Sequence, residues 1–121
     1  MEDVSSNDLA YIGDAVIELA VREYLVTKGH GPGAPSEEAL KFVTAVAQSD
    51  ALARIEDALT EEESDVYKRA RNNYHTSNVP KSATPLQYRR STGFEAVFGY
   101  LYLCGERGRI EKLFKIAYGL E

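Results

Sequence analysis

Apolar residues recur at three- and four-residue spacing along most of this chain, and no segment alternates apolar and polar residues in the way a half-buried strand does. The first periodic segment covers residues 9–28, with inward positions at Leu9, Ile12, Val16, Leu19 and Ala20. Asn7 or Asp8 can cap its start, and Gly29 ends it. This spacing restricts the chain to an all-α fold.

Further helical segments follow the first. The second begins at Ser36 and is expected to break near Ser49, and its apolar stripe consists of Leu40, Val43, Val46, Ala47, Leu52, Ile55 and Leu59. Thr60 and Glu63 have the spacing of a capping box. The box predicts a third helix that ends near Asn72.

A polar segment, residues 72–83, is expected to form an exposed connection. Thr84 then caps a long fourth helix with Pro85 at its first position, where a missing N–H costs nothing, and Gly105 ends this helix. The last helix is expected over residues 109–118, with its inward positions at Leu113, Ile116 and Ala117. Together the segments predict a helical bundle.

Length and composition favour one globular domain over residues 1–121, because a chain of 121 residues can bury a core without disulfides. The composition is ordinary, with 44% hydrophobic and 27% charged residues. The single cysteine, Cys104, lies in an apolar run and is expected to be a small core residue. The start of the chain is acidic and polar, unlike a secretory signal, and the longest apolar stretch is shorter than the roughly 20 residues that span a membrane. These features predict a cytoplasmic protein with no membrane partner.

Charge is unevenly distributed along the chain. The formal net charge of −5 argues against a protein that coats nucleic acid non-specifically. Residues 66–94 nevertheless contain no Asp or Glu, and their basic residues are Lys68, Arg69, Arg71, Lys81, Arg89 and Arg90. A basic zone on an acidic body is therefore expected.

Asp14 is an anomaly of the first segment, because it lies on or beside the face that is expected to pack. Burying an unpaired carboxylate costs on the order of several kcal/mol, so it needs a cation, a metal ion or several hydrogen bonds. The preceding Gly13 costs a helix about 1 kcal/mol relative to Ala. This cost indicates that another group approaches the backbone closely here.

Glu95 repeats the pattern in the fourth segment, as the one acid in the apolar run from Gly93 to Gly99. Two carboxylates that meet where two helices cross repel each other unless a divalent cation lies between them. Mg²⁺ commonly uses one or two carboxylates and several waters, so Asp14 and Glu95 are candidate ligands of an open Mg²⁺ site. On pattern alone, the alternative is that each acid pairs with a Lys or Arg or faces solvent.

Several short segments carry a resemblance to a known family. They are residues 9–16 (Leu-Ala-Tyr-Ile-Gly-Asp-Ala-Val), 69–72 (Arg-Ala-Arg-Asn), 79–81 (Val-Pro-Lys), 88–96 (Tyr-Arg-Arg-Ser-Thr-Gly-Phe-Glu-Ala) and 99–103 (Gly-Tyr-Leu-Tyr-Leu). In this order they resemble the ribonuclease III family, and most closely its Mini-ribonuclease III subfamily. The resemblance extends from about Leu9 to Leu113, and several motifs in the correct order are far more specific than any one alone.

The resemblance implies a helical catalytic domain that acts as a homodimer and has no separate double-stranded-RNA-binding domain. It implies Mg²⁺-dependent cleavage of double-stranded RNA to 5′-phosphate and 3′-hydroxyl ends, with the large-subunit ribosomal RNA precursor as substrate. Asp14 falls on the family's essential aspartate and Glu95 on its essential glutamate, both tied to Mg²⁺. Larger members carry two more acids where this chain has Ala10 and Thr92. A metal site with four carboxylates is therefore not expected.

The basic zone fits this substrate, because A-form RNA is recognised largely through its phosphates and 2′-hydroxyls. Candidates for backbone contacts are Lys68, Arg69, Arg71, Lys81, Arg89 and Arg90. For any one of them the alternative is a solvated helix face. His75 and Asn78 are weaker candidates on an exposed loop, and Phe98, Tyr100 and Tyr102 are expected in the core or on a dimer surface.

Two other functions stay open on the sequence alone. One is a non-catalytic helical dimer that holds duplex RNA or a protein partner, although the presence of both Asp14 and Glu95 speaks against it. The other is a helical adaptor in which the two acids pair with Arg89 or Arg90.

Overall fold

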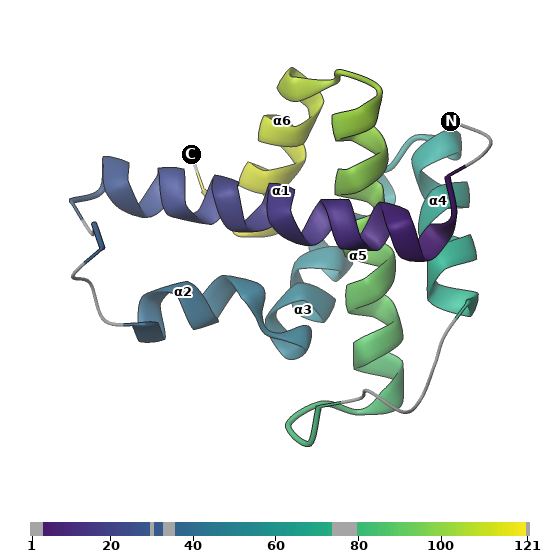
Figure 1. Cartoon of the computed structure of the whole chain (residues 1–121), viewed down its shortest axis with the longest axis horizontal. Helices are drawn as coiled ribbons and strands as arrows, with labels where there is room; N and C mark the ends of the chain where they lie inside the picture. The colour runs from purple at the N-terminus through teal and green to yellow at the C-terminus, as the bar shows by residue number, and fades with distance from the viewer. Residues whose placement is uncertain (1–3, 30, 33–35, 74–79, 121) are drawn as a thin grey trace.

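The computed structural model describes residues 4–29, 31–32, 36–73 and 80–120, and every regular element in this part of the chain is a helix (Figure 1). The elements are α1 (Ser6–Thr27), α2 (Ser36–Val43), α3 (Ala45–Ile55), the short 3-10 turn η1 (Glu56–Ala58), α4 (Glu61–Asn72), α5 (Pro85–Leu103) and α6 (Arg107–Ala117). The predicted all-α fold is confirmed. His75 and Asn78 lie outside the described residues.

Side-chain caps fix where the helices begin. Thr60 forms the predicted capping box with Glu63, and Thr84 caps α5 as predicted and also forms a capping box with Gln87, so α4 and α5 start where the sequence places them. The predicted cap of α1 was wrong. Ser5 caps this helix by accepting a hydrogen bond of 3.1 Å from the backbone nitrogen of Asp8, which starts α1 at Ser6.

The break in the second helical segment lies at Thr44 and not near Ser49. Thr44 has an extended backbone, and its hydroxyl accepts a hydrogen bond of 3.1 Å from the nitrogen of Ala47 at the start of α3. Ser49 is buried in the middle of α3, where its hydroxyl accepts a hydrogen bond from Arg90 of α5. Both polar residues are satisfied, but only Thr44 has the backbone conformation of a helix start.

The core is built around α5. In Figure 1, α1 runs across the middle of α5, while α3, α4 and α6 lie around it. The fully buried side chains include those of Ile17, Leu52, Ile55, Phe94, Val97, Phe98 and Leu113. No helix in the described ranges is long and apolar enough to cross a membrane.

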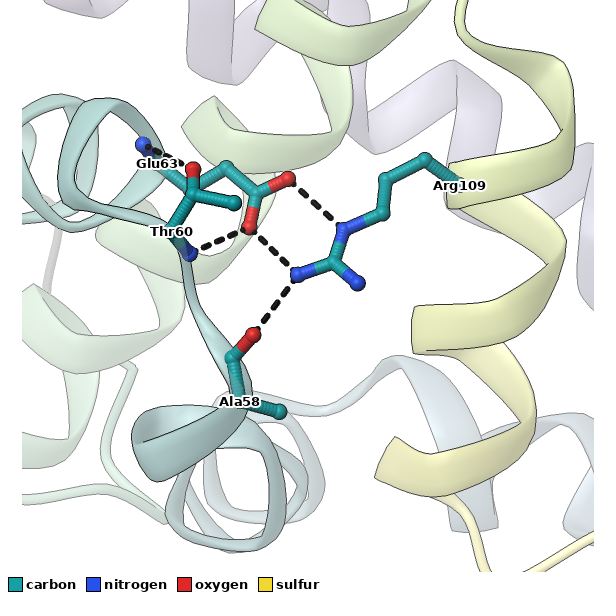
Figure 2. Close-up of polar contacts among 4 residues, drawn as sticks. All are labelled: Ala58, Thr60, Glu63 and Arg109. Carbon is teal, nitrogen blue, oxygen red and sulfur yellow. Dashed lines mark hydrogen bonds and ion pairs between the residues drawn. The ribbon is translucent and has the colours of Figure 1, made fainter.

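A buried ion pair joins α4 to α6 (Figure 2). Arg109 donates to both carboxylate oxygens of Glu63, at 2.9 and 2.8 Å, and to the carbonyl of Ala58 at 2.7 Å. The same Glu63 carboxylate accepts a hydrogen bond of 2.9 Å from the backbone nitrogen of Thr60. Burial raises the pKa of Glu63, but the bonds from Arg109 and Thr60 outweigh it and hold the pKa below its usual value.

Four predicted inward positions are exposed. Leu19 is 68% exposed, because α1 buries Ile17 and Val21 and turns Leu19 away from them, and Leu40 of α2 is 50% exposed. Cys104 is exposed because it caps the end of α5, where Gly105 turns the chain with a φ of 75°. Ile116 is 37% exposed, because α6 buries Leu113, Phe114 and Ala117 and turns Ile116 away from them. Of the aromatic residues at the end of α5, Phe98 is buried, Tyr100 is partly buried and Tyr102 is exposed.

Candidate functional site

Two glycines set how closely α1 and α5 cross. A Cβ atom on Gly13 would overlap the carbonyl oxygen of Glu95 and lie 3.0 Å from the nitrogen of Gly99. A Cβ atom on Gly99 would overlap the carbonyl oxygen of Leu9 and lie 3.0 Å from the nitrogen of Gly13. The close backbone approach predicted at Gly13 is therefore confirmed, and the approaching group is the backbone of α5.

This crossing brings together the side chains of Asp14 and Glu95, which come from two helices. Burial, the charge of Asp14 and a hydrogen bond to Asp14 raise the pKa of Glu95 to about 8. The nearby side-chain amide of Gln48 in α3 acts in the opposite direction and lowers this pKa. The polar groups that shift this pKa are an acid and an amide, and neither is the cation that a helical adaptor would need.

The two acids are less buried than predicted. Asp14 is exposed and Glu95 is only partly buried. The reason lies in the geometry of α1, whose buried residues are Leu9, Ala10, Gly13, Ile17, Val21 and Leu25. Asp14 directly follows Gly13, so its side chain lies at the edge of the buried face of α1 and not within it. The acid pair is therefore open to solvent on one side.

The acid pair fits a divalent cation. Two carboxylates that repel each other are both stabilised when they share a cation, and an open side lets water complete the coordination. Among the described residues, no group of three or more His, Cys, Asp and Glu side chains is placed to hold a metal. Ala10 is buried, and Thr92 donates its hydroxyl to the Tyr88 carbonyl at 3.1 Å. The arrangement thus offers two carboxylates, as the sequence leads us to expect.

Three of the six predicted basic residues gather between the end of α4 and the start of α5. They line an open pocket of about 220 Å³, whose walls are formed by Tyr67, Arg71, Asn72, Leu86, Arg89 and Arg90. The guanidinium of Arg71 lies over the ring of Tyr67, 5.3 Å from its centroid. Lys68, Arg69 and Lys81 are exposed but do not line this pocket.

Comparison with known families gives a match over most of the chain, because the Ribonuclease III domain matches residues 7–106. The chain belongs to the ribonuclease III family. It is accordingly an endoribonuclease, and its family acts on double-stranded RNA. The matched residues include Asp14, Glu95 and all six predicted basic residues.

Individual relatives agree with the ribonuclease III assignment. The Mini-ribonuclease 3 of Symbiobacterium thermophilum is 44% identical over 90% of this chain and 84% of its own length. The Mini-ribonuclease 3 of Streptococcus pneumoniae is 45% identical over 87% of this chain and 84% of its own length. A crystal structure of a protein from Fusobacterium nucleatum has the same fold, with a TM-score of 0.88 and 32% identity, and covers 98% of this chain and 97% of its own.

Gln48 is a site residue of this ribonuclease III domain that the sequence prediction missed. Its side chain is 2% exposed, although it is polar, and it interacts with Glu95. A signal was available, because Gln48 precedes Ala51, Leu52 and Ile55 by three, four and seven residues. This is the spacing of one helix face, so an inward position could have been predicted.

The helix α3 also connects the acid pair to the basic pocket. Arg90 donates from Nε to the hydroxyl of Ser49 at 3.1 Å, and its Nη2 lies 3.6 Å from Oε1 of Glu56. Ser49 directly follows Gln48, which faces Glu95. The acid pair and one wall of the pocket are therefore held by neighbouring residues of one helix.

Proposed function

We propose that this domain cleaves double-stranded RNA in a Mg²⁺-dependent reaction at the Asp14–Glu95 pair. The observation that carries the proposal is the meeting of these two side chains at the α1–α5 crossing, beside an open face. In a purely structural site a Lys or Arg would be expected to pair with such an acid, as Arg109 of α6 pairs with Glu63 of α4.

Asp14 and Glu95 would hold the Mg²⁺ ion, and the bound ion would supply a lowered pKa for a bound water and a positive charge near the phosphate. Asp14 is the exposed member, so a substrate that enters from solvent would reach its side of the pair first. Glu95 is the partly buried member, and its interaction with Gln48 favours the ionised form that can bind a cation. Attack by water on the phosphorus would break its bond to the 3′ oxygen, which takes up a proton, and would leave 5′-phosphate and 3′-hydroxyl ends.

The basic pocket is proposed to bind a phosphate of the RNA backbone. Its volume of about 220 Å³ admits one phosphate group, and Arg71, Arg89 and Arg90 contribute three guanidinium groups to its walls. Guanidinium groups bind phosphate oxygens without reading the base sequence. The exposed Lys68, Arg69 and Lys81 are proposed to contact more distant phosphates.

The domain is also proposed to act as a homodimer, in which each of two sites cuts one strand. Apolar side chains on the outer side of α1 support this proposal, because Tyr11 is 83%, Leu19 68% and Val26 61% exposed. A second copy of the chain could cover them. Asp14 lies on the same helix, so the dimer would place each acid pair near the interface.

The large-subunit ribosomal RNA precursor is the proposed natural substrate, and the cytoplasm is the proposed location. The order of the segments that resemble the Mini-ribonuclease III subfamily supports this substrate. Cleavage of a transcript that carries the base-paired ends of this precursor, at one position on each strand, would test it.

The function is tested by incubating the purified chain with a long duplex RNA, with Mg²⁺ or with excess chelator. Asp14→Asn should lower the rate of cleavage at least about a thousandfold, because a metal ligand supplies several kcal/mol of transition-state stabilisation. Glu23→Gln, which removes another exposed acid of α1, is the matched control and should cut normally. Single-stranded RNA should stay intact.

Two outcomes would change the proposal. Cleavage by Asp14→Asn at the parent rate would exclude a metal role for the acid pair. An intact duplex to which the protein nevertheless binds would favour the non-catalytic helical dimer.

A further inference from the structure

The side-chain amide of Gln48 is buried beside the acid pair, and packing does not explain it. Its Nε2 atom makes no hydrogen bond in the described part of the protein, although the residue is only 2% exposed. A buried donor left without a partner costs about 1–3 kcal/mol. Because Leu or Met would fill the same space without this cost, the amide needs a partner in the working protein.

The rest of Gln48 is firmly held. Its backbone nitrogen donates to the carbonyl of Thr44 at 2.9 Å. The next residue, Ser49, is bound through its hydroxyl at 3.1 Å and through its carbonyl at 3.4 Å by Arg90. Only the end of the Gln48 side chain lacks a partner of good geometry, and the carboxylate with which it interacts is that of Glu95.

We infer that Gln48 is a positioning residue, which donates from Nε2 to the carboxylate of Glu95 and orients it toward the cation shared with Asp14. The inference rests on the proposed function and adds a third residue to its site. An amide N–H that binds one carboxylate oxygen leaves the other oxygen available for the cation. Partners that orient metal ligands in this way commonly change metal affinity about 10- to 100-fold.

The unaltered protein provides a direct test, because the chain contains only two glutamines, Gln48 and Gln87. Gln87 is a natural control, since its Oε1 accepts a hydrogen bond of 2.9 Å from the nitrogen of Thr84 in the cap of α5. In a titration with Mg²⁺ followed by NMR, the side-chain amide signals of Gln48 should move together with the backbone signals of Asp14 and Glu95. Those of Gln87 should stay in place.

This titration separates the inference from the proposed function. Movement at Asp14 and Glu95 without any change at the Gln48 side chain would overturn the inference and leave the proposed metal site standing. No movement at Asp14 or Glu95 at millimolar Mg²⁺ would overturn both.

Substitution gives a second readout that does not depend on cleavage. Gln48→Met keeps the length of the side chain and removes the amide, so the variant should unfold in chelator at the same temperature as the parent or higher. Its affinity for Mn²⁺, measured from the electron paramagnetic resonance signal of the free ion, should fall about tenfold or more. Gln87→Met makes the same change at the cap and should bind Mn²⁺ as the parent does.

A Gln48→Met variant that folds and binds Mn²⁺ with the parent's affinity would show that the amide has no role in the site. If this variant does not fold, the NMR titration of the unaltered chain decides the question.

Discussion

Glu63 and Glu95 are glutamates with opposite surroundings. Glu63 is almost fully buried, yet three hydrogen bonds donated by Arg109 and Thr60 hold its pKa below the usual value. Glu95 is more exposed, yet burial of its carboxyl group and the neighbouring Asp14 raise its pKa to about 8. The degree of burial alone therefore does not decide how costly a carboxylate is.

The difference lies in what the fold places beside each acid. At Glu63 an arginine reaches across from α6 and donates to both carboxylate oxygens (Figure 2). At Glu95 the neighbouring helix contributes a second acid, and α3 contributes an amide. The first arrangement is complete as it stands and serves stability, whereas the second lacks a cation among the described residues and is the proposed metal site.

The largest expected effect concerns the Glu63 pair. Arg109→Met leaves a buried carboxylate without its cation and should lower the free energy of unfolding by about 3–5 kcal/mol, measured in urea. Arg107→Met, at the exposed start of α6, is the control and should cost little. A variant with parental stability would show that Glu63 does not depend on its partner, and the contrast with Glu95 would fail.

The next effect concerns the crossing that creates the acid pair. Gly13→Ala forces a methyl group into the backbone of α5 and should cost about 3 kcal/mol, measured by thermal unfolding. Gly108→Ala is the control, because nothing lies within 4 Å of its Cβ position in α6, and it should be neutral or gain up to about 1 kcal/mol. Equal effects at the two glycines would contradict a close backbone contact at Gly13.

The pH dependence of stability should separate the two glutamates. In chelator, folded Glu95 keeps its proton up to a pH of about 8, whereas in the unfolded chain it loses the proton near 4.5. The contribution of Glu95 to the free energy of unfolding is therefore complete below pH 4.5 and is lost as the pH rises to about 8. The free energy of unfolding falls by at most about 1.4 kcal/mol per pH unit in this range. Glu95→Gln should make the free energy of unfolding less dependent on pH between 5 and 8, measured in buffers with chelator.

Adding Mg²⁺ provides the control for this pH dependence, because a bound cation favours the ionised form of Glu95. Stabilisation by Mg²⁺ should therefore grow between pH 6 and 8. A stabilisation independent of pH would place the cation elsewhere.

The smallest effect is that of Asp14→Asn on stability without metal. At pH 9 in chelator, where Glu95 has lost its proton, removal of one of the two like charges should raise the free energy of unfolding by about 1 kcal/mol, the size of a screened charge interaction at close range. Glu23→Gln should stay within about 0.5 kcal/mol of the parent. A less stable Asp14→Asn would mean that Asp14 stabilises the fold as Glu63 does.

Local signals allowed most of the helices to be predicted. The capping boxes at Thr60 and Thr84 need only residues three positions apart, and both starts were placed correctly. The break at Thr44 was missed because many residues can begin a helix, and the choice of Thr44 depends on how α2 and α3 pack against the rest. The exposure of Cys104 likewise depends on where α5 leaves the core.

The candidate site could be predicted in part. Acids within apolar segments drew attention to Asp14 and Glu95, and the structure brings these two together. Their exposure could not be predicted, since it depends on the angle at which α1 lies on α5. Gln48 was missed because an amide gives a weaker signal in a helix than a carboxylate does. The single-domain organisation and the cytoplasmic location stay predictions.

The reciprocal contact at Gly13 and Gly99 has a consequence for how this protein can change over evolution or by design. Because backbone meets backbone there, the spacing of the two helices that carry the acids is set by main-chain atoms and not by the size of a side chain between them. Side chains away from this crossing and from the candidate site can therefore be exchanged for better-packing ones without changing the backbone contact. A heat-resistant form of the enzyme should be obtainable in this way at no loss of activity, provided that both glycines and the residues of the acid pair and the basic pocket are kept.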